Sequence, residues 1–194
     1  MTAIIDYKAG NLTSVKLAFA ALGAETLVTS DPAAIAAADR VVFPGVGAAR
    51  SAMENLKALG LVDAVGEAAA TKPFLGICLG MQILFDRSEE DGGVECLGII
   101  PGRVRRFPSV PGFKVPEIGW NGVEGLDGKE FYFVHSYYAE IVPETTGVAE
   151  YAGVKFTAMV RNGRLWACQF HPEKSGRVGL DLLRAWLAVP LRYS

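Results

Sequence analysis

Short apolar runs alternate with amphipathic or alanine-rich stretches through the first half of the chain. Four short runs read as strands, and they lie at 3–5, 26–28, 41–43 and 73–77, of which the last two are apolar throughout. The apolar residues after Asn11 recur at helical spacing as far as Gly23, so Asn11 can cap this helix and Gly23 can end it. Strands that are apolar on both faces and separated by helices indicate a parallel sheet covered on both sides.

Three more helices are predicted in this half. Asp31-Pro32 begins an alanine-rich helical turn, with aspartate as the cap and proline at the first helical position. A long helix is expected over roughly 50–70, with a break near Gly60. The strand at 73–77 is expected to run directly into a helix over 81–87.

The second half of the chain has a different pattern. Stretches 130–138 and 157–170 are rich in β-branched and aromatic residues, and Asn162-Gly163 stands between two alternating runs, which predicts a hairpin. An amphipathic helix around 178–186 follows, and the glycine- and proline-rich stretch 107–128 is expected to be a surface loop. The whole pattern predicts one α/β domain over 1–194. Its expected architecture is an open, mostly parallel sheet flanked by helices, with an antiparallel hairpin region in the second half.

Composition narrows the possible functions. With 51% apolar and 21% charged residues the chain should form a globular core, and its net charge of −2 argues against a nucleic-acid partner. No apolar stretch approaches the ~18–20 residues that cross a bilayer, and no secretion signal is evident, so we expect a cytoplasmic protein without membrane contact. The three cysteines are too scattered for a disulfide framework or a zinc site, and we expect no metal and no cofactor.

Cys78 is the first candidate for chemistry. It stands where the strand 73–77 should meet the next helix, and Gly76 and Gly80 flank it at two residues on each side. A sharp strand-to-helix turn needs such glycines, presents nucleophiles in other α/β enzymes, and favours a thiolate through the helix amides. The alternative is a buried structural cysteine, which is what we expect of Cys96 and Cys168.

Histidine is scarce, because the chain has only His135 and His171. Glu173 follows His171 at a spacing that places both side chains on one face of an extended segment, where the carboxylate can fix the imidazole tautomer. The alternative for this segment is a capping histidine beside a solvated glutamate. No carboxylate follows His135 at such spacing, so we expect His135 in a wall or loop rather than as the base.

A glycine-rich loop at 44–47 follows the strand 41–43. It should lie at the same sheet edge as Cys78, where its backbone amides could stabilise an oxyanion. An ordinary turn between strand and helix is the alternative. The loop matches neither common nucleotide-binding glycine pattern.

These motifs together resemble the class I (triad) glutamine amidotransferases. GICLGMQ at 76–82 and QFHPE at 169–173 carry the resemblance, which extends from the first strand to about Gly176. More narrowly, DYKAGNL at 6–12, PGVGA at 44–48, IGWN at 118–121 and HPEKSG at 171–176 are similar to the glutaminase subunits of imidazole glycerol phosphate synthases. The chain departs from that pattern at Lys8, where glycine is usual, and at Glu117, where histidine is common.

The resemblance implies hydrolysis of L-glutamine to glutamate and ammonia through a cysteine thioester. It makes Cys78 the nucleophile, His171 the proton carrier and Glu173 its support. It also implies a set of oxyanion and substrate positions, namely Gly45, Val46, Gly47, Leu79, Gln82, Ser136 and Tyr137. Gln82 fits that role from its own position too, because it lies one turn after the cysteine, where an amide can bind an amino-acid head group.

The resemblance further implies a heterodimer with a (β/α)₈-barrel cyclase, which receives the ammonia for histidine biosynthesis. Asn11, Trp120 and Lys174 match positions at the partner face or gate, although a helix cap and a solvated charge are equally good accounts of Asn11 and Lys174. Three other functions stay open. They are an amidotransferase with a different client, a binding module with a vestigial triad, and a cysteine hydrolase of the same elbow type.

Overall fold

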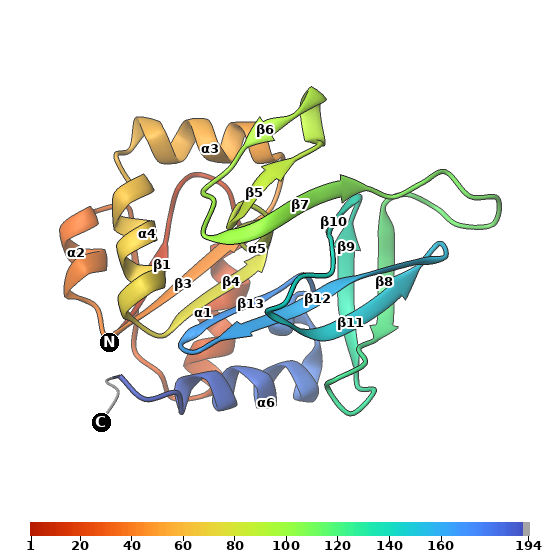
Figure 1. The fold of residues 1–194 in the computed structure, drawn as a ribbon. Helices are drawn as coiled ribbons and strands as arrows, with labels where there is room; N and C mark the ends of the chain where they lie inside the picture. The colour runs from red at the N-terminus through yellow and green to blue at the C-terminus, as the bar shows by residue number, and fades with distance from the viewer. Residues whose placement is uncertain (192–194) are drawn as a thin grey trace.

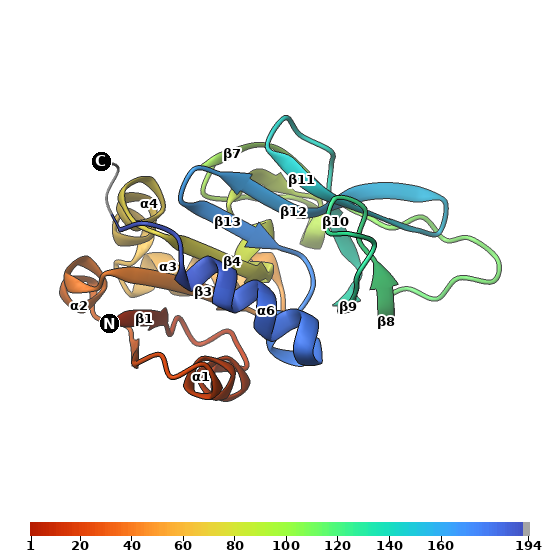
Figure 2. The same ribbon diagram turned by 90° about the horizontal axis from the view of Figure 1, so that it is seen from below.

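The computed structural model describes residues 1–191, which form a large central sheet with helices on both faces (Figures 1 and 2). The sheet order is β2-β1-β3-β4-β13-β12-β10-β7-β5-β6, and β11 pairs with β12 outside this path. The first five strands of this order run parallel: β2 (Thr26–Thr29), β1 (Thr2–Ile5), β3 (Arg40–Gly45), β4 (Phe74–Cys78) and β13 (Leu165–Cys168).

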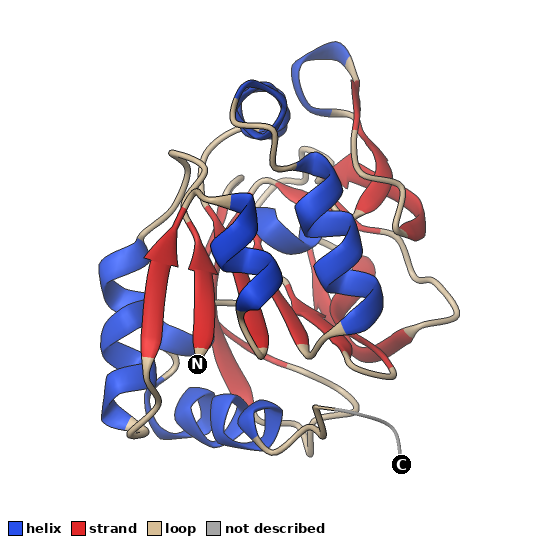
Figure 3. Ribbon diagram, turned by 90° about the vertical axis from the view of Figure 1, so that its left-hand side faces the viewer, coloured by secondary structure: helices blue, strands red, loops and turns tan. Residues whose placement is uncertain are grey.

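Alternate residues of these strands enter two separate hydrophobic cores. Ile5, Val41 and Phe43 pack against helices α2 (Pro32–Ala37), α3 (Ala49–Ala58) and α4 (Val62–Thr71) on one face. Ile4 and Val42 pack with α1 (Leu12–Ala21) and α6 (Gly176–Leu187) on the other, an arrangement that Figure 3 shows from the strand edge. Both faces of each strand are therefore covered, which explains the consecutive apolar positions.

The antiparallel half continues the sheet beyond β13. Its strands are β12 (Val154–Asn162), β11 (Thr145–Tyr151), β10 (Tyr137–Ala139), β7 (Ile100–Arg106), β5 (Phe85–Ser88) and β6 (Val94–Glu95). They pair antiparallel except for β5 with β7, which is a parallel pair. Two further strands, β8 (Glu117–Gly122) and β9 (Glu130–His135), form a separate antiparallel pair. The predicted α/β class, with its open parallel sheet and antiparallel second half, is confirmed.

Local signals placed several helix ends correctly. The Asn11 side chain accepts a hydrogen bond from Ser14 N at 3.4 Å, and Asp31 Oδ1 accepts one from Ala33 N at 2.9 Å. The expected break near Gly60 separates α3 from α4, and Gly60 has a φ of +65°. Within residues 1–191, no helix combines the length and apolar character needed to cross a membrane.

Three expectations were wrong. The helix predicted over 81–87 is only the short α5 (Leu79–Gln82), and the chain is already in β5 from Phe85, because a fully buried apolar run gives no period that separates helix from strand. The stretch 107–128 contains β8, whose glycines made it resemble a loop. Cys96 is partly exposed rather than buried, whereas Cys168 is buried as expected.

The predicted hairpin is present between β12 and β13, but its turn lies one residue later than Asn162-Gly163. Asn162 pairs with Leu165, so Gly163 and Arg164 form the connection, and only Gly163 of these has positive φ, at +58°. Glycine at the first connecting position is typical of the two-residue turns that match strand twist.

Candidate active site

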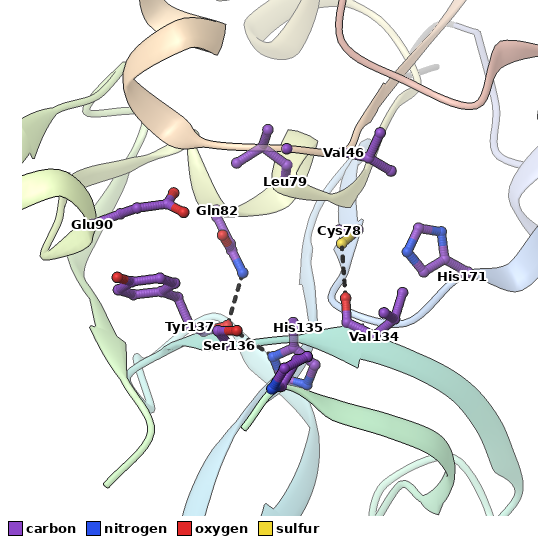
Figure 4. A pocket seen from close by; sticks show the side chains of 12 residues that line it. Val46, Cys78, Leu79, Gln82, Glu90, Val134, His135, Ser136, Tyr137 and His171 are labelled. Carbon is purple, nitrogen blue, oxygen red and sulfur yellow. Dashed lines mark hydrogen bonds between the residues drawn. The ribbon is translucent and has the colours of Figure 1, made fainter. Parts of the chain in front are cut away.

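Cys78 is the last residue of β4 and lies immediately before α5, at the carboxyl edge of the parallel strands. Its φ of +54° with ψ of −113° lies in a region that residues with a β-carbon rarely occupy. Such strain persists only where the surrounding structure imposes it, and it is typical of functional positions. The Cys78 sulfur lies 4.0 Å from the carbonyl oxygen of Val134 and faces a pocket (Figure 4).

The glycines beside Cys78 are required by backbone packing. A β-carbon on Gly80 would lie 1.8 Å from the Phe43 carbonyl oxygen, and one on Gly76 would lie 3.1 Å from the Gly80 carbonyl oxygen. Gly45 is under a similar constraint, because a β-carbon there would lie 2.1 Å from the Tyr7 hydroxyl. β3, β4 and α5 can approach this closely only because these positions lack side chains.

His171 follows β13, the strand next to β4, so the two segments leave the sheet side by side. Its Nδ1 lies 2.7 Å from Glu173 Oε1, and both side chains are 2% exposed. The backbone holds this segment in place, since His171 N donates to Tyr132 O at 2.9 Å and Ser175 Oγ donates to His171 O at 2.6 Å. His171 Nε2 is buried and has no hydrogen-bond partner among residues 1–191, which leaves it available for proton transfer.

The charge state of His171 is set by opposing effects. Burial of the ring lowers the pKa of His171, but the neighbouring Cys78 and Glu173 together outweigh burial and raise this pKa to about 10. At neutral pH the ring is therefore an imidazolium. A cationic imidazole beside the sulfur stabilises a thiolate, which is the reactive form of cysteine.

Glu173→Gln is expected to lower the pKa of His171 from about 10, because a neutral amide removes one of the two groups that hold the proton. The chain has only two histidines, so NMR of histidine-labelled protein reads each ring separately. In the wild type, the folded state holds this proton of His171 more tightly than the unfolded state does, so the proton adds to the free energy of unfolding. This contribution is complete below pH 6.5 and is lost as the pH rises to about 10.

His171→Asn assigns the two ring signals in this experiment, and His135 serves as the internal reference. Cys78→Ala is expected to lower the same pKa, since it removes the other favourable group. Unchanged His171 titration in both Glu173→Gln and Cys78→Ala would contradict the coupling of the three side chains.

Cys78 and His171 both line one cavity of about 360 Å³, a size suited to a small molecule. It is lined by Val46, Gly47, Cys78, Leu79, Gln82, Glu90, Pro116, Val134, His135, Ser136, Tyr137 and His171. Every expected oxyanion or substrate position except Gly45 is in this wall. Gly45 packs against Tyr7 and Gly80 at the end of β3.

Comparisons with known proteins identify the family of the chain. Residues 3–187 match the family described as glutamine amidotransferase class-I. The chain belongs to this family. The class I amidotransferase fold is also seen in a crystal structure of a glutamine amidotransferase, which aligns with a TM-score of 0.74 at 21% identity over 96% of this chain and 97% of that one.

More similar amidotransferase relatives are known by sequence. A protein of Methanothermobacter thermautotrophicus, named imidazole glycerol phosphate synthase subunit HisH, is 48% identical, with 97% of this chain and 98% of the relative covered. A protein of the same name from Dechloromonas aromatica is 50% identical, with 94% and 93% covered. The family resemblance expected from the sequence motifs is thus confirmed.

Two acidic residues at this candidate site have contacts that were not expected from the sequence. Glu90, in the short helix η1 (Glu90–Gly92), lines the pocket, and its Oε2 accepts a hydrogen bond from Ala49 N at 2.7 Å. Burial raises the pKa of Glu90, partly offset by the Ala49 amide. No local motif marks Glu90, because its role depends on the β5–β6 connection folding against α3.

Glu117 is the second unexpected residue. His135 is in the pocket wall as expected, but it has a carboxylate partner after all, since its Nε2 lies 2.8 Å from Glu117 Oε2 on the adjacent strand β8. Its Nδ1 lies 2.8 Å from Tyr137 O, and Asn121 Nδ2 donates to Glu117 Oε1 at 2.9 Å. Glu117 therefore completes a buried polar cluster at the position where histidine is common.

The three expected partner-face residues lie on different elements of the fold. Asn11 caps α1, Lys174 is exposed in the short helix η2 (Pro172–Lys174), and Trp120 on β8 is 55% exposed. Lys8, which departs from the usual glycine, has a φ of +64° in the left-handed region that favours glycine. Among residues 1–191 there is no cluster of three or more metal-ligating side chains.

Proposed function

We propose that this chain hydrolyses L-glutamine to glutamate and ammonia as the amidotransferase subunit of an imidazole glycerol phosphate synthase in cytoplasmic histidine biosynthesis. The observation that carries this proposal is the convergence of Cys78, His171 and Glu173 at one small pocket, in a chain whose relatives are named as that subunit. The ammonia would pass to a (β/α)₈-barrel cyclase in a heterodimer.

Cys78, His171 and Glu173 have separate roles in this reaction. The Cys78 thiolate attacks the side-chain carbon of glutamine, and the resulting oxyanion is stabilised by the backbone amides of Leu79 and the Val46–Gly47 loop. His171 Nε2 gives its proton to the departing nitrogen, which leaves as ammonia. Water then attacks the thioester, His171 takes up the proton, and glutamate and the Cys78 thiolate are released. Glu173 holds the imidazole in orientation throughout.

The amino-acid head group of glutamine would bind at the opposite end of the pocket. Both Nε2 protons of Gln82 are used within the protein, by Tyr137 O at 2.8 Å and Gln169 Oε1 at 2.9 Å, so Gln82 offers its Oε1 to the substrate. The Glu90 carboxylate, which also lines the pocket, offers a negative charge to the ammonium group of the substrate. The backbone of Ser136 and Tyr137 forms the remaining wall.

Glu90→Gln is expected to raise the KM for glutamine about tenfold, with a smaller effect on kcat, because a charge-assisted hydrogen bond to the ammonium is lost. The glutamine side chain can still accept from Ala49 N, so the start of α3 stays capped. Steady-state glutaminase kinetics of the complete complex measure both constants.

Glu95→Gln is the matched control for Glu90→Gln. Glu95 lies in β6, directly after this connection, but it is exposed and pairs with Arg87, so its replacement should change KM less than twofold. A KM for Glu90→Gln equal to that of the control would contradict the assigned head-group contact.

The proposed function is tested by measuring glutaminase activity with and without a barrel cyclase and its nucleotide substrate. We expect the cyclase to copurify with the chain and to raise the rate of glutamine hydrolysis. Copurification of a synthase from another pathway would show that the chain supplies ammonia to a different partner enzyme. Activity on a peptide rather than on glutamine would instead favour a cysteine hydrolase.

A further inference from the structure

Gln169 is a fully buried amide beside the reactive sulfur. It follows β13 directly, two residues before His171, and none of its surface is exposed. Its Nε2 lies 3.6 Å from the Cys78 sulfur, within hydrogen-bonding distance for sulfur, and its backbone N donates to Ala158 O at 2.9 Å. The catalytic steps derived above give this side chain no role.

The surrounding hydrogen bonds determine which end of the Gln169 amide faces the sulfur. Tyr137 O can only accept, so the Gln82 group facing it at 2.8 Å must be the NH₂ (Figure 4). The second proton of that NH₂ is directed to Gln169 Oε1 at 2.9 Å. Turning Gln169 over would bring two NH₂ groups together, so its own NH₂ must face Cys78.

His135, which lies further from the sulfur, also fixes the orientation of the two amides. Since Tyr137 O accepts only, His135 Nδ1 at 2.8 Å must carry a proton toward it. The other ring nitrogen is held by Glu117, as described above. A continuous buried chain of donors and acceptors thus connects β8 to the Cys78 sulfur, and reversing one amide would leave several groups mismatched.

We propose that Gln169 is a catalytic residue that donates a hydrogen bond to the sulfur of Cys78 and stabilises its thiolate. The sulfur is negative before it attacks and again when it leaves the thioester, so the same N–H assists both steps. His171 provides the mobile proton, whereas Gln169 provides a fixed dipole that cannot give its proton away. This proposal rests on Cys78 being the nucleophile of the proposed function.

The test is the pH dependence of Cys78 alkylation by iodoacetamide in the complete chain, read by peptide mass spectrometry so that Cys96 and Cys168 are followed separately. Gln169→Met keeps the length of the side chain but removes the donor. We expect it to raise the midpoint pH of alkylation by about half a unit to one unit. Gln169→Glu can still accept from Gln82 but brings a negative charge to the sulfur, so its midpoint should rise by more than about one unit.

Thr157→Val is the matched control. Thr157 is a fully buried polar residue on neighbouring β12, and its hydroxyl bonds Glu140 O at 2.6 Å and Thr145 Oγ1 at 2.7 Å rather than Cys78. Its replacement should lower stability without moving the alkylation midpoint. In the cyclase complex, Gln169→Met should lower glutamine-dependent kcat about tenfold, with KM and ammonia-dependent synthesis little changed.

An alkylation midpoint that stays at the wild-type value in both Gln169 variants would overturn the proposal, as would an equal shift in Thr157→Val. If Gln169→Met does not fold, Gln169→Asn withdraws the donor by one methylene and is read in the same way. Alkylation reports the surroundings of Cys78 whatever its role. A failure of the proposed function would instead appear as glutaminase activity that survives in Cys78→Ala.

Discussion

Replacing Cys78 by alanine is expected to reduce glutamine-dependent synthesis by a factor of about 10⁴ or more, while ammonia-dependent synthesis by the same complex continues. The sulfur forms the covalent bond in the proposed reaction, and no other thiol lines the pocket. Free ammonia bypasses this step, because it enters the reaction that follows. Product formation with each nitrogen source, measured on one preparation, separates the two activities.

The strained backbone at Cys78 makes stability a necessary control for this variant. Alanine at a φ of +54° bears the same β-carbon, so Cys78→Ala should unfold at nearly the wild-type denaturant concentration. Cys168→Ala, which changes another buried cysteine, should retain glutaminase activity. Equal loss of glutamine- and ammonia-dependent synthesis in Cys78→Ala would contradict the assignment of Cys78 as the nucleophile.

Gly80→Ala is expected to lower the free energy of unfolding by about 3 kcal/mol or more and to abolish glutaminase activity. The added methyl group would lie 1.8 Å from the Phe43 carbonyl oxygen, and no side-chain rotation relieves the contact, because a β-carbon is fixed by its own backbone and its partner is a backbone atom. Relief requires β3 and α5 to separate, which displaces Cys78 from the pocket. Urea unfolding followed by circular dichroism measures the loss.

Gly66→Ala provides the comparison, because Gly66 lies within helix α4 and a β-carbon there meets nothing within 4 Å. This variant should gain up to about 1 kcal/mol, since alanine has less backbone freedom to lose in a helix. If both variants unfold at the same urea concentration, the glycine at position 80 has no packing role.

The two segments that carry the proposed catalytic residues could be recognised in the sequence because their signals are local. Gly76 and Gly80 border Cys78 within five residues, and Glu173 is two residues from His171. The parallel arrangement of β3 and β4 then follows from apolar strands between helices, and it brings the carboxyl ends of these two strands to one edge. The pairing of β13 with β4, which brings His171 beside Cys78, joins segments about 90 residues apart, and no local signal predicted it.

The supporting polar groups were missed because their partners lie on distant segments. Gln169 is bonded to Gln82, 87 residues away. Glu117 is bonded to His135 across the β8–β9 pair, and Glu117 lies in the stretch that was expected to be a loop. The sequence placed Gly45 in the oxyanion loop, but in the structure Gly45 lies where β3 approaches Tyr7 too closely for a β-carbon. Pairing of this kind depends on tertiary packing, which periodicity does not encode.

The loop between β3 and α3 is held in place at both of its ends. Gly45 packs closely against Tyr7 and Gly80, and Ala49 N donates a hydrogen bond to the Glu90 carboxylate. Any reorientation of an amide toward the substrate is therefore confined to the three intervening residues, as a crankshaft rotation of one peptide plane rather than the swing of a lid. Activation of this kind would leave the Cα trace almost unmoved and would be detected only by probes of individual amide groups.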